Sequence, residues 1–180
     1  PSVLSAQQIQ GKALSYNTVN DTGAALRLVS EFDAPAIAII KHANPCGVAV
    51  ADDPLSAWQH ALEADPVSAF GGIVACNRRL DGKLASEIAS IFTELVIAPD
   101  ADDAAREALA SKSNLRLLLT ANLPDPAASE LAVKSVLGGY LVQSRDNGQI
   151  TRDDLQFVTQ IKPSDAQIED MLIAWKIAKH

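Results

Sequence analysis

Mostly apolar runs alternate with helical patterns along the first two thirds of the chain. Runs typical of strands buried on both faces occupy residues 36–40, 72–76, 95–98 and 115–119. Apolar side chains recur at helical spacing over residues 21–32, 56–64, 82–92 and 102–110. Asp21 or Thr22 is the expected N-cap of the first helix. This alternation of helices and buried strands predicts an α/β fold.

The pattern changes after residue 130. Residues 133–144 and 155–159 are β-like, and Asp146-Asn-Gly148 between them has the chemistry of a tight turn. We expect Gly138-Gly139 to serve a close approach between β segments. Ser164 is the expected cap of a final helix with an apolar face.

Length and composition exclude several classes of protein. The 180 residues, 48% of them hydrophobic, can bury the core of one domain with room for a small appendage. The longest apolar runs are too short to cross a bilayer. A net charge of −7 without a basic run argues against a nucleic-acid surface. Cys46 and Cys76 form neither a disulfide framework nor a metal-ligand pattern, so we expect a cytoplasmic protein with free thiols.

The sharpest polar motif is Lys41-His-Ala-Asn-Pro-Cys-Gly47, which directly follows the predicted strand 36–40. In open α/β sheets, ligands bind outside the carboxyl ends of strands, so the motif falls where a site is expected. An ammonium group beside a histidine disfavours the imidazolium, so Lys41 would help His42 to stay neutral and accept a proton. The residues from Asn44 onward would form a fixed turn that presents backbone donors. The alternative is that the pair merely ends a strand in solvent.

The same motif partly matches the signature of zinc deaminases, a His-x-Glu followed by Pro-Cys-x-x-Cys. Asn44 stands where the proton-carrying Glu belongs, and Ala49 stands where the second Cys belongs. We therefore expect no metal site. Cys46 is close to His42 in sequence and is a candidate nucleophile, but a structural, partly buried thiol is the favoured interpretation.

Two further polar segments are candidates for ligand contact. Asp65-Pro-Val-Ser-Ala-Phe-Gly-Gly72 is a turn-rich loop in which Gly71 and Gly72 would let the backbone approach a ligand. Two glycines before a strand are also typical of an ordinary tight turn. Gln10-Gly-Lys-Ala-Leu-Ser-Tyr-Asn17 is a dense polar run, and solvated edge residues would look the same. Glu94 precedes a predicted strand, which is the wrong end for a site at carboxyl ends.

Taken together, the polar segments 10–17, 41–47 and 65–73 closely resemble, in order and spacing, one protein domain. This is the bacterial AICAR transformylase domain of the bifunctional AICAR transformylase/IMP cyclohydrolase family. Ile97-Ala-Pro99 and Trp175-Lys-Ile-Ala-Lys179 fit the same pattern. The resemblance implies a cytidine-deaminase-like, three-layer α/β/α fold with a mixed sheet and no zinc. Residues 1–180 would then be the N-terminal part of the transformylase domain.

The resemblance also implies an activity, which is transfer of a formyl group from 10-formyltetrahydrofolate to the 5-amino group of AICAR, giving FAICAR in purine biosynthesis. No metal is implied in catalysis. His42 would accept the proton of the attacking amine, and Lys41 would stabilise the tetrahedral centre. Glu94 would meet the base of AICAR. The substrate-binding residues that the resemblance implies are Asn44, Ser68, Phe70, Gly71, Gly72 and Glu94.

Several parts of the family pattern are missing. An Arg-Tyr-Gly-Glu-Asn segment should precede Gln10, a Ser-Asn-Ala-Ile segment should follow His180, and the cyclohydrolase domain and later folate-site segments are absent. Position 18 is Thr where the family pattern has Asn. Family members are homodimers with sites built across the interface. We therefore expect a fragment that is incomplete for activity; the alternative is an inactive scaffold or a partial nucleotide-binding module.

Overall fold

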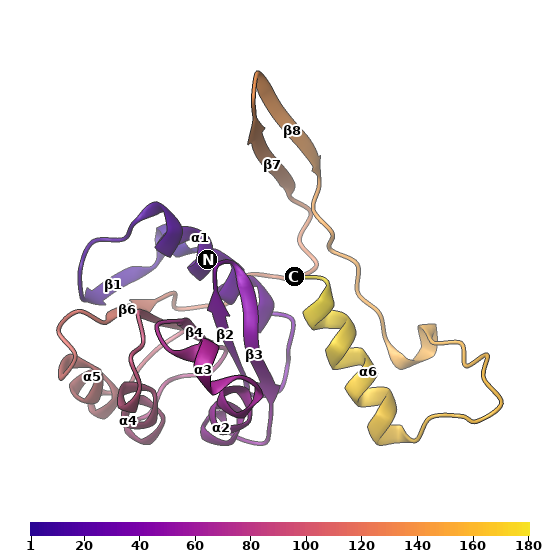
Figure 1. The fold of residues 1–180 in the computed structure, drawn as a ribbon, viewed down its shortest axis with the longest axis horizontal. Coiled ribbons are helices and arrows are strands. Elements are labelled where there is room, and N and C mark those ends of the chain that lie inside the picture. Colours follow the sequence, from indigo (N-terminus) through magenta and orange to yellow (C-terminus); the bar gives the residue numbers. More distant parts are fainter. The chain divides into compact units, whose positions relative to one another are not determined.

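The computed structural model describes residues 1–180, which divide into two compact units, Pro1–Pro124 with His180 and Asp125–Lys179 (Figure 1). A six-stranded sheet forms the centre of the first unit, in the order β1-β6-β5-β4-β2-β3. Its strands are β1 (Gln7–Gln10), β2 (Ala36–Lys41), β3 (Asn44–Val50), β4 (Ile73–Cys76), β5 (Leu95–Ala98) and β6 (Arg116–Leu119).

The sheet is mixed. Strands β4, β5 and β6 run parallel to one another, because a helix connects each to the next. Strand β2 is antiparallel to β4, strand β3 is antiparallel to β2, and β1 is antiparallel to β6. Every residue of β4 and β5 is buried, which explains why these strands lack polar alternation in the sequence.

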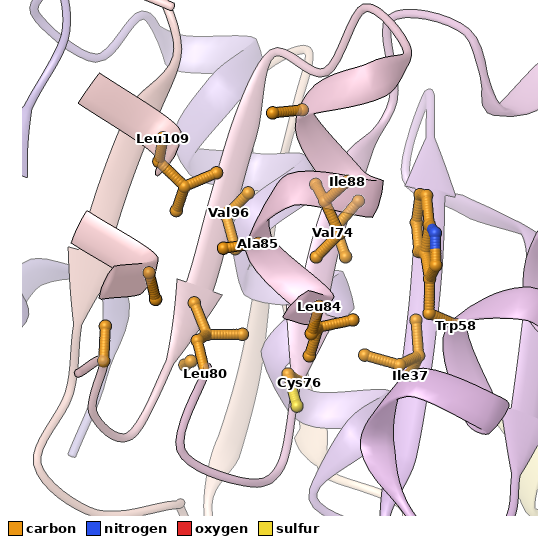
Figure 2. Packing of buried hydrophobic residues seen from close by; sticks show 14 of the residues in the cluster. Ile37, Trp58, Val74, Cys76, Leu80, Leu84, Ala85, Ile88, Val96 and Leu109 are labelled. Carbon is orange, nitrogen blue, oxygen red and sulfur yellow. The ribbon is translucent and has the colours of Figure 1, made fainter. Parts of the chain in front are cut away.

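Helices cover both faces of the sheet. Helices α2 (Pro54–Ala64), α4 (Gly82–Ser90) and α5 (Asp103–Ala110) share one hydrophobic core with the sheet. Figure 2 shows Trp58 of α2 and Leu84 of α4 packed in this core against strand residues that include Ile37. Helix α1 (Tyr16–Val29) packs on β2 and β4 from the other side. The expected three-layer α/β/α architecture with a mixed sheet is confirmed.

The apolar pattern of the sequence predicted the buried strands more accurately than it predicted the polar ends of the helices. The predicted strand 95–98 coincides with β5. Helix α1, in contrast, begins at Tyr16, and Ser15 rather than Asp21 or Thr22 is its N-cap; the Ser15 Oγ accepts a hydrogen bond from the Thr18 amide at 3.2 Å. The first turn of α1 carries polar, mostly exposed side chains, so hydrophobic periodicity does not mark it.

The second unit contains a two-stranded hairpin, β7 (Leu131–Val136) and β8 (Gly139–Ser144), and helix α6 (Asp165–Ala178). The predicted strand at 155–159 is wrong, and the hairpin turns at Leu137 and Gly138. The Asp146–Gly148 turn is present, since the Gly148 amide donates to the Asp146 carboxylate at 3.1 Å, but it does not join two strands. Gly138 has a φ of 87°, and no atom comes within 4 Å of the position of its missing Cβ. It therefore serves the turn conformation, and no close approach of backbones occurs there.

The predicted cap of the last helix is confirmed. The Ser164 Oγ accepts from the Gln167 amide at 3.3 Å, and the Gln167 Oε1 accepts from the Ser164 amide at 2.9 Å. This reciprocal pair is a capping box. None of the helices is both long and apolar enough to cross a membrane.

Candidate functional site

The Lys-His motif lies at the tip of the β2–β3 hairpin. Lys41 pairs with Asn44, which leaves His42 and Ala43 as a two-residue turn. The fixed turn expected from Asn44 onward is wrong, because these residues form strand β3. The Asn44 side chain closes the tip by donating from Nδ2 to the His42 carbonyl at 2.8 Å. Breaks in the apolar pattern at Pro45 and Gly47 hid this strand in the sequence.

The hairpin turn holds two residues in the left-handed region. The φ angles of His42 and Ala43 are 57° and 60°, as a type I′ turn requires. Glycine or asparagine usually occupies such positions, because a Cβ there costs about 1–2 kcal/mol per residue. Strained backbone of this kind is concentrated at functional sites. The turn projects His42 into solvent, with its amide donating to the Asp21 carboxylate of α1 at 3.2 Å.

A β-bulge explains the position of Cys46. Ile39 pairs with Gly47 and Ile40 pairs with Pro45, so Cys46 is the extra residue of the edge strand. Its thiol donates to the Ile39 carbonyl at 3.4 Å, and burial is the largest cause that raises the pKa of Cys46. A raised pKa keeps the sulfur protonated near neutrality, which argues against a nucleophilic role.

The antiparallel direction of β2 brings the candidate residues to one edge of the sheet. Lys41 ends β2, whereas Gly72, Glu94 and Arg116 stand at the beginnings of β4, β5 and β6. Backbone hydrogen bonds join them in a row, from the Glu94 amide to Gly72 O at 3.0 Å and from the Arg116 amide to Glu94 O at 3.2 Å. The expectation that Glu94 lies at the wrong strand end is therefore incorrect, since it assumed parallel strands throughout.

Lys41 connects the hairpin to the loop at residues 65–72. Its Nζ donates to the Phe70 carbonyl at 2.8 Å. Asp65 caps the short helix α3 (Pro66–Ala69) by accepting from the Ser68 amide at 2.8 Å. Hydrogen bonds from Ser68 lower the pKa of Asp65, with a smaller contribution from the charge of Lys41. The cap thus orders the start of the loop, and the bond from Lys41 holds Phe70 near the hairpin tip.

An aromatic pair and two glycines complete this loop. The rings of Phe70 and Phe92 lie 5.2 Å apart, and both side chains remain about half exposed. Gly71 has a φ of 76° and donates its amide to the Phe92 carbonyl at 2.7 Å. A Cβ on Gly72 would lie 3.2 Å from the Ile40 carbonyl. Gly71 thus supplies an unusual conformation and Gly72 supplies space, while part of the aromatic surface stays exposed.

Glu94 has a partner that the sequence analysis missed. The Arg116 Nη1 lies 2.7 Å from the Glu94 Oε2, with 11% of the arginine side chain and 44% of the glutamate side chain exposed. Arg116 also donates from Nε to the Lys12 carbonyl at 3.2 Å. The third polar segment of the sequence, residues 10–17, therefore reaches the same edge. The sequence assigned Arg116 no role, because it belongs to none of the polar motifs and only interrupts the apolar run 115–119.

The edge also borders a hollow of about 380 Å³ between the ends of α4 and α5. Phe92 and Leu115 line it, together with Lys112. None of the predicted site residues lines this hollow. Elsewhere in the chain, no three His, Cys, Asp or Glu side chains are grouped so that they could hold a metal ion.

Comparison with known proteins agrees with the motifs at this edge. The AICARFT/IMPCHase bienzyme family matches residues 1–180. The bifunctional purine biosynthesis proteins PurH of Paracoccus denitrificans and Parvibaculum lavamentivorans are each 58% identical to the chain over 183 residues. The PurH of Brucella anthropi is 56% identical. Each alignment covers 100% of the chain but only 34–35% of the relative, so the chain spans about a third of the length of these proteins.

Proposed function

The chain belongs to the AICARFT/IMPCHase bienzyme family, and on that basis we propose that it carries the catalytic Lys-His pair of an AICAR formyltransferase. The reaction is transfer of a formyl group from 10-formyltetrahydrofolate to the 5-amino group of AICAR, giving FAICAR in purine biosynthesis. One observation carries the proposal: Lys41, His42, Phe70 and Glu94, which come from separate segments of the sequence, lie at one edge of the sheet.

The arrangement at this edge supports a division of roles. The nitrogen of the amine bonds to the formyl carbon, and its proton passes to His42. The bond from that carbon to N10 of the folate then breaks, and His42 returns the proton to N10 as tetrahydrofolate leaves. Lys41 stabilises the negative charge on the formyl oxygen. The exposed position of His42 gives it access to a proton on a bound substrate, which a general base requires. No metal takes part in these steps.

The nucleotide would lie along the row of strand beginnings. Phe70 offers an aromatic face for a flat heterocycle, and the backbone at Gly71 and Gly72 can come close to it. Asn44, the cross-strand partner of Lys41, and Ser68 of α3 supply further polar groups. The Glu94 carboxylate is an acceptor for N–H groups of the base.

The remaining parts of the proposal concern the longer protein. Residues 1–180 are the N-terminal part of the transformylase domain, and the parent protein is a cytoplasmic homodimer that also has IMP cyclohydrolase activity. Its ligands are small molecules, with neither nucleic acid nor membrane as partner. The chain alone is incomplete for turnover. The competing function is a folded scaffold or partial nucleotide-binding module without catalysis, which the short span relative to the PurH proteins favours for the isolated chain.

Titration of AICAR into the chain by calorimetry, followed by addition of 10-formyltetrahydrofolate and an assay for FAICAR, tests this function. The test protein is compared with a Lys41→Ala, His42→Ala double variant. His60→Ala is the matched control, because His60 is an exposed histidine on α2. We expect AICAR binding by the chain and its control, with any FAICAR formation abolished in the double variant.

The outcomes separate the two functions. Turnover that depends on Lys41 and His42 establishes the enzyme, and binding without turnover establishes the nucleotide-binding module. Turnover that survives in the double variant contradicts the catalytic assignment. Absence of both binding and turnover contradicts the enzyme and the nucleotide-binding module for the isolated chain, and agrees with a folded scaffold only.

A further inference from the structure

Arg116 makes more connections than any other side chain at the candidate edge. It is the first residue of β6, and only 11% of its side chain is exposed. Its Nη1 donates to the Glu94 carboxylate at 2.7 Å, and its Nε donates to the Lys12 carbonyl at 3.2 Å. Its Nη2 lies 3.5 Å from the Ala13 carbonyl. One guanidinium group therefore joins the carboxylate to the backbone of residues 12–13.

The backbone at residues 10–13 is built to lie against β6. Gly11 has a φ of 90°, and a Cβ there would lie 2.4 Å from the Leu115 carbonyl. Gln10 donates from Nε2 to that same carbonyl at 3.1 Å. Gln8 donates from Nε2 to the Lys12 carbonyl at 2.8 Å. The loop thus has independent anchors, and the Arg116 guanidinium is the group that links it to Glu94.

The oxygen of the Glu94 carboxylate that Arg116 does not contact can accept hydrogen bonds from a ligand. Arg116 donates a hydrogen bond to Oε2 of Glu94, and 44% of the Glu94 side chain is still exposed. A planar guanidinium held by backbone carbonyls fixes the orientation of a carboxylate better than a single ammonium does, because its donors form a rigid fork. Fixing an acceptor before a ligand arrives removes the entropy cost of ordering it on binding.

We propose that Arg116 is a positioning residue: it fixes Glu94 so that the free carboxylate oxygen accepts hydrogen bonds from the N–H donors of a heteroaromatic amine or amide. This role rests on the proposed function, because Glu94 contacts the base there. Arg116 itself does not touch the ligand. Its second effect is to hold the Lys12 backbone against the same edge, so that the polar segment 10–17 borders the ligand.

The test compares Arg116→Gln, Arg116→Lys, Glu94→Gln and the Arg116→Gln, Glu94→Gln double variant, each in the full 180-residue chain. AICAR affinity is measured by calorimetry and stability by thermal unfolding. Arg106→Gln is the matched control, because Arg106 pairs with Asp100 beyond the opposite end of β5, with 3.5 Å between Nη2 and Oδ1. Carbodiimide labelling of Glu94 and amide exchange of residues 11–13 are measured without ligand.

We expect Arg116→Gln to weaken AICAR binding roughly tenfold, as for loss of one charge-assisted hydrogen bond. The double variant should bind no more weakly than Glu94→Gln, because the two residues act as one unit. Arg116→Lys should restore part of the affinity. Without ligand, Arg116→Gln should speed both the labelling of Glu94 and exchange at residues 11–13, whereas Arg106→Gln changes neither.

Unchanged affinity in Arg116→Gln, or additive losses in the double variant, would overturn the proposal. If the unmodified chain binds no AICAR, the nucleotide site fails for this chain, and the ligand-free measurements decide the role of Arg116. Unchanged Glu94 labelling and unchanged exchange then refute it. Should Arg116→Gln fail to fold, the same comparisons with Arg116→Lys decide between positioning and a purely structural role.

Discussion

Side chains at the candidate edge are held mainly by backbone carbonyls of other segments. Lys41 donates to Phe70, Arg116 donates to Lys12, and Asn44 donates to His42. Lys41 and Asn44 are therefore placed by the path of the backbone, whereas Arg116 also pairs with the Glu94 carboxylate. A change in a loop should accordingly disturb the site as much as a change in a functional residue.

The two thiols provide a prediction at the scale of single residues. Burial, the largest cause, raises the pKa of Cys76 to about 11, whereas Cys46 lies partly exposed in the bulge of β3. The thiolate is the reactive form, so we expect iodoacetamide to label Cys46 first, with a rate that rises with pH above neutrality. Cys76 should react only as fast as the protein unfolds. Mass spectrometry of peptides labelled at pH 8 measures both rates, and equal labelling would contradict the burial of Cys76.

Packing between elements depends on a few glycines. Gly47 of β3 faces α2, and a Cβ at that position would lie 2.0 Å from the Ala61 carbonyl. Helix backbone cannot shift by that amount without losing its own hydrogen bonds. The β2–β3 hairpin, which holds Lys41 and His42 at its tip, is thereby packed closely against α2.

Alanine substitutions at two glycines test this packing. Gly47→Ala should destabilise the protein by about 3 kcal/mol, because the new methyl group must displace backbone. Gly23→Ala should stabilise it by about 0.5–1 kcal/mol, since Gly23 lies within α1 with nothing within 4 Å of its missing Cβ. Urea unfolding midpoints measure both. A Gly47→Ala protein as stable as the parent would show that β3 and α2 are not in close contact.

At the scale of the whole molecule, the two units differ in how they are stabilised. The first unit buries its sheet between helices, and β5 has four fully buried residues. In the second unit, every residue of β7 and β8 is exposed, including Leu131, Leu141 and Val142. An isolated two-stranded hairpin is marginally stable at best in water.

The rate of amide hydrogen exchange should therefore differ between the two units. Amides of β7 and β8 are expected to exchange orders of magnitude faster than those of β5, because their opening exposes little additional apolar surface. Mass spectrometry with peptides from both units provides the measurement. Comparable protection of the hairpin would indicate that a second copy of the chain covers its apolar side chains, and dilution should then remove the protection.

The sequence by itself determined the α/β class, the buried strands and the capped final helix. It also determined the motifs that carry the family resemblance, because short-range patterns of polarity encode these features directly. Its periodicity failed where elements are polar or bear proline, as at the start of α1 and throughout β3.

Only the tertiary structure decided which candidate residues lie at one edge of the sheet. The antiparallel pairing of β2 with β4 brings the end of one strand beside the beginnings of others, and so places Lys41 at the same edge as Glu94. Strand direction depends on contacts between residues far apart in the chain, which no local pattern specifies. The contacts of Arg116 could be recognised only in the structure for the same reason, because they join residues 22 and 104 positions away along the chain.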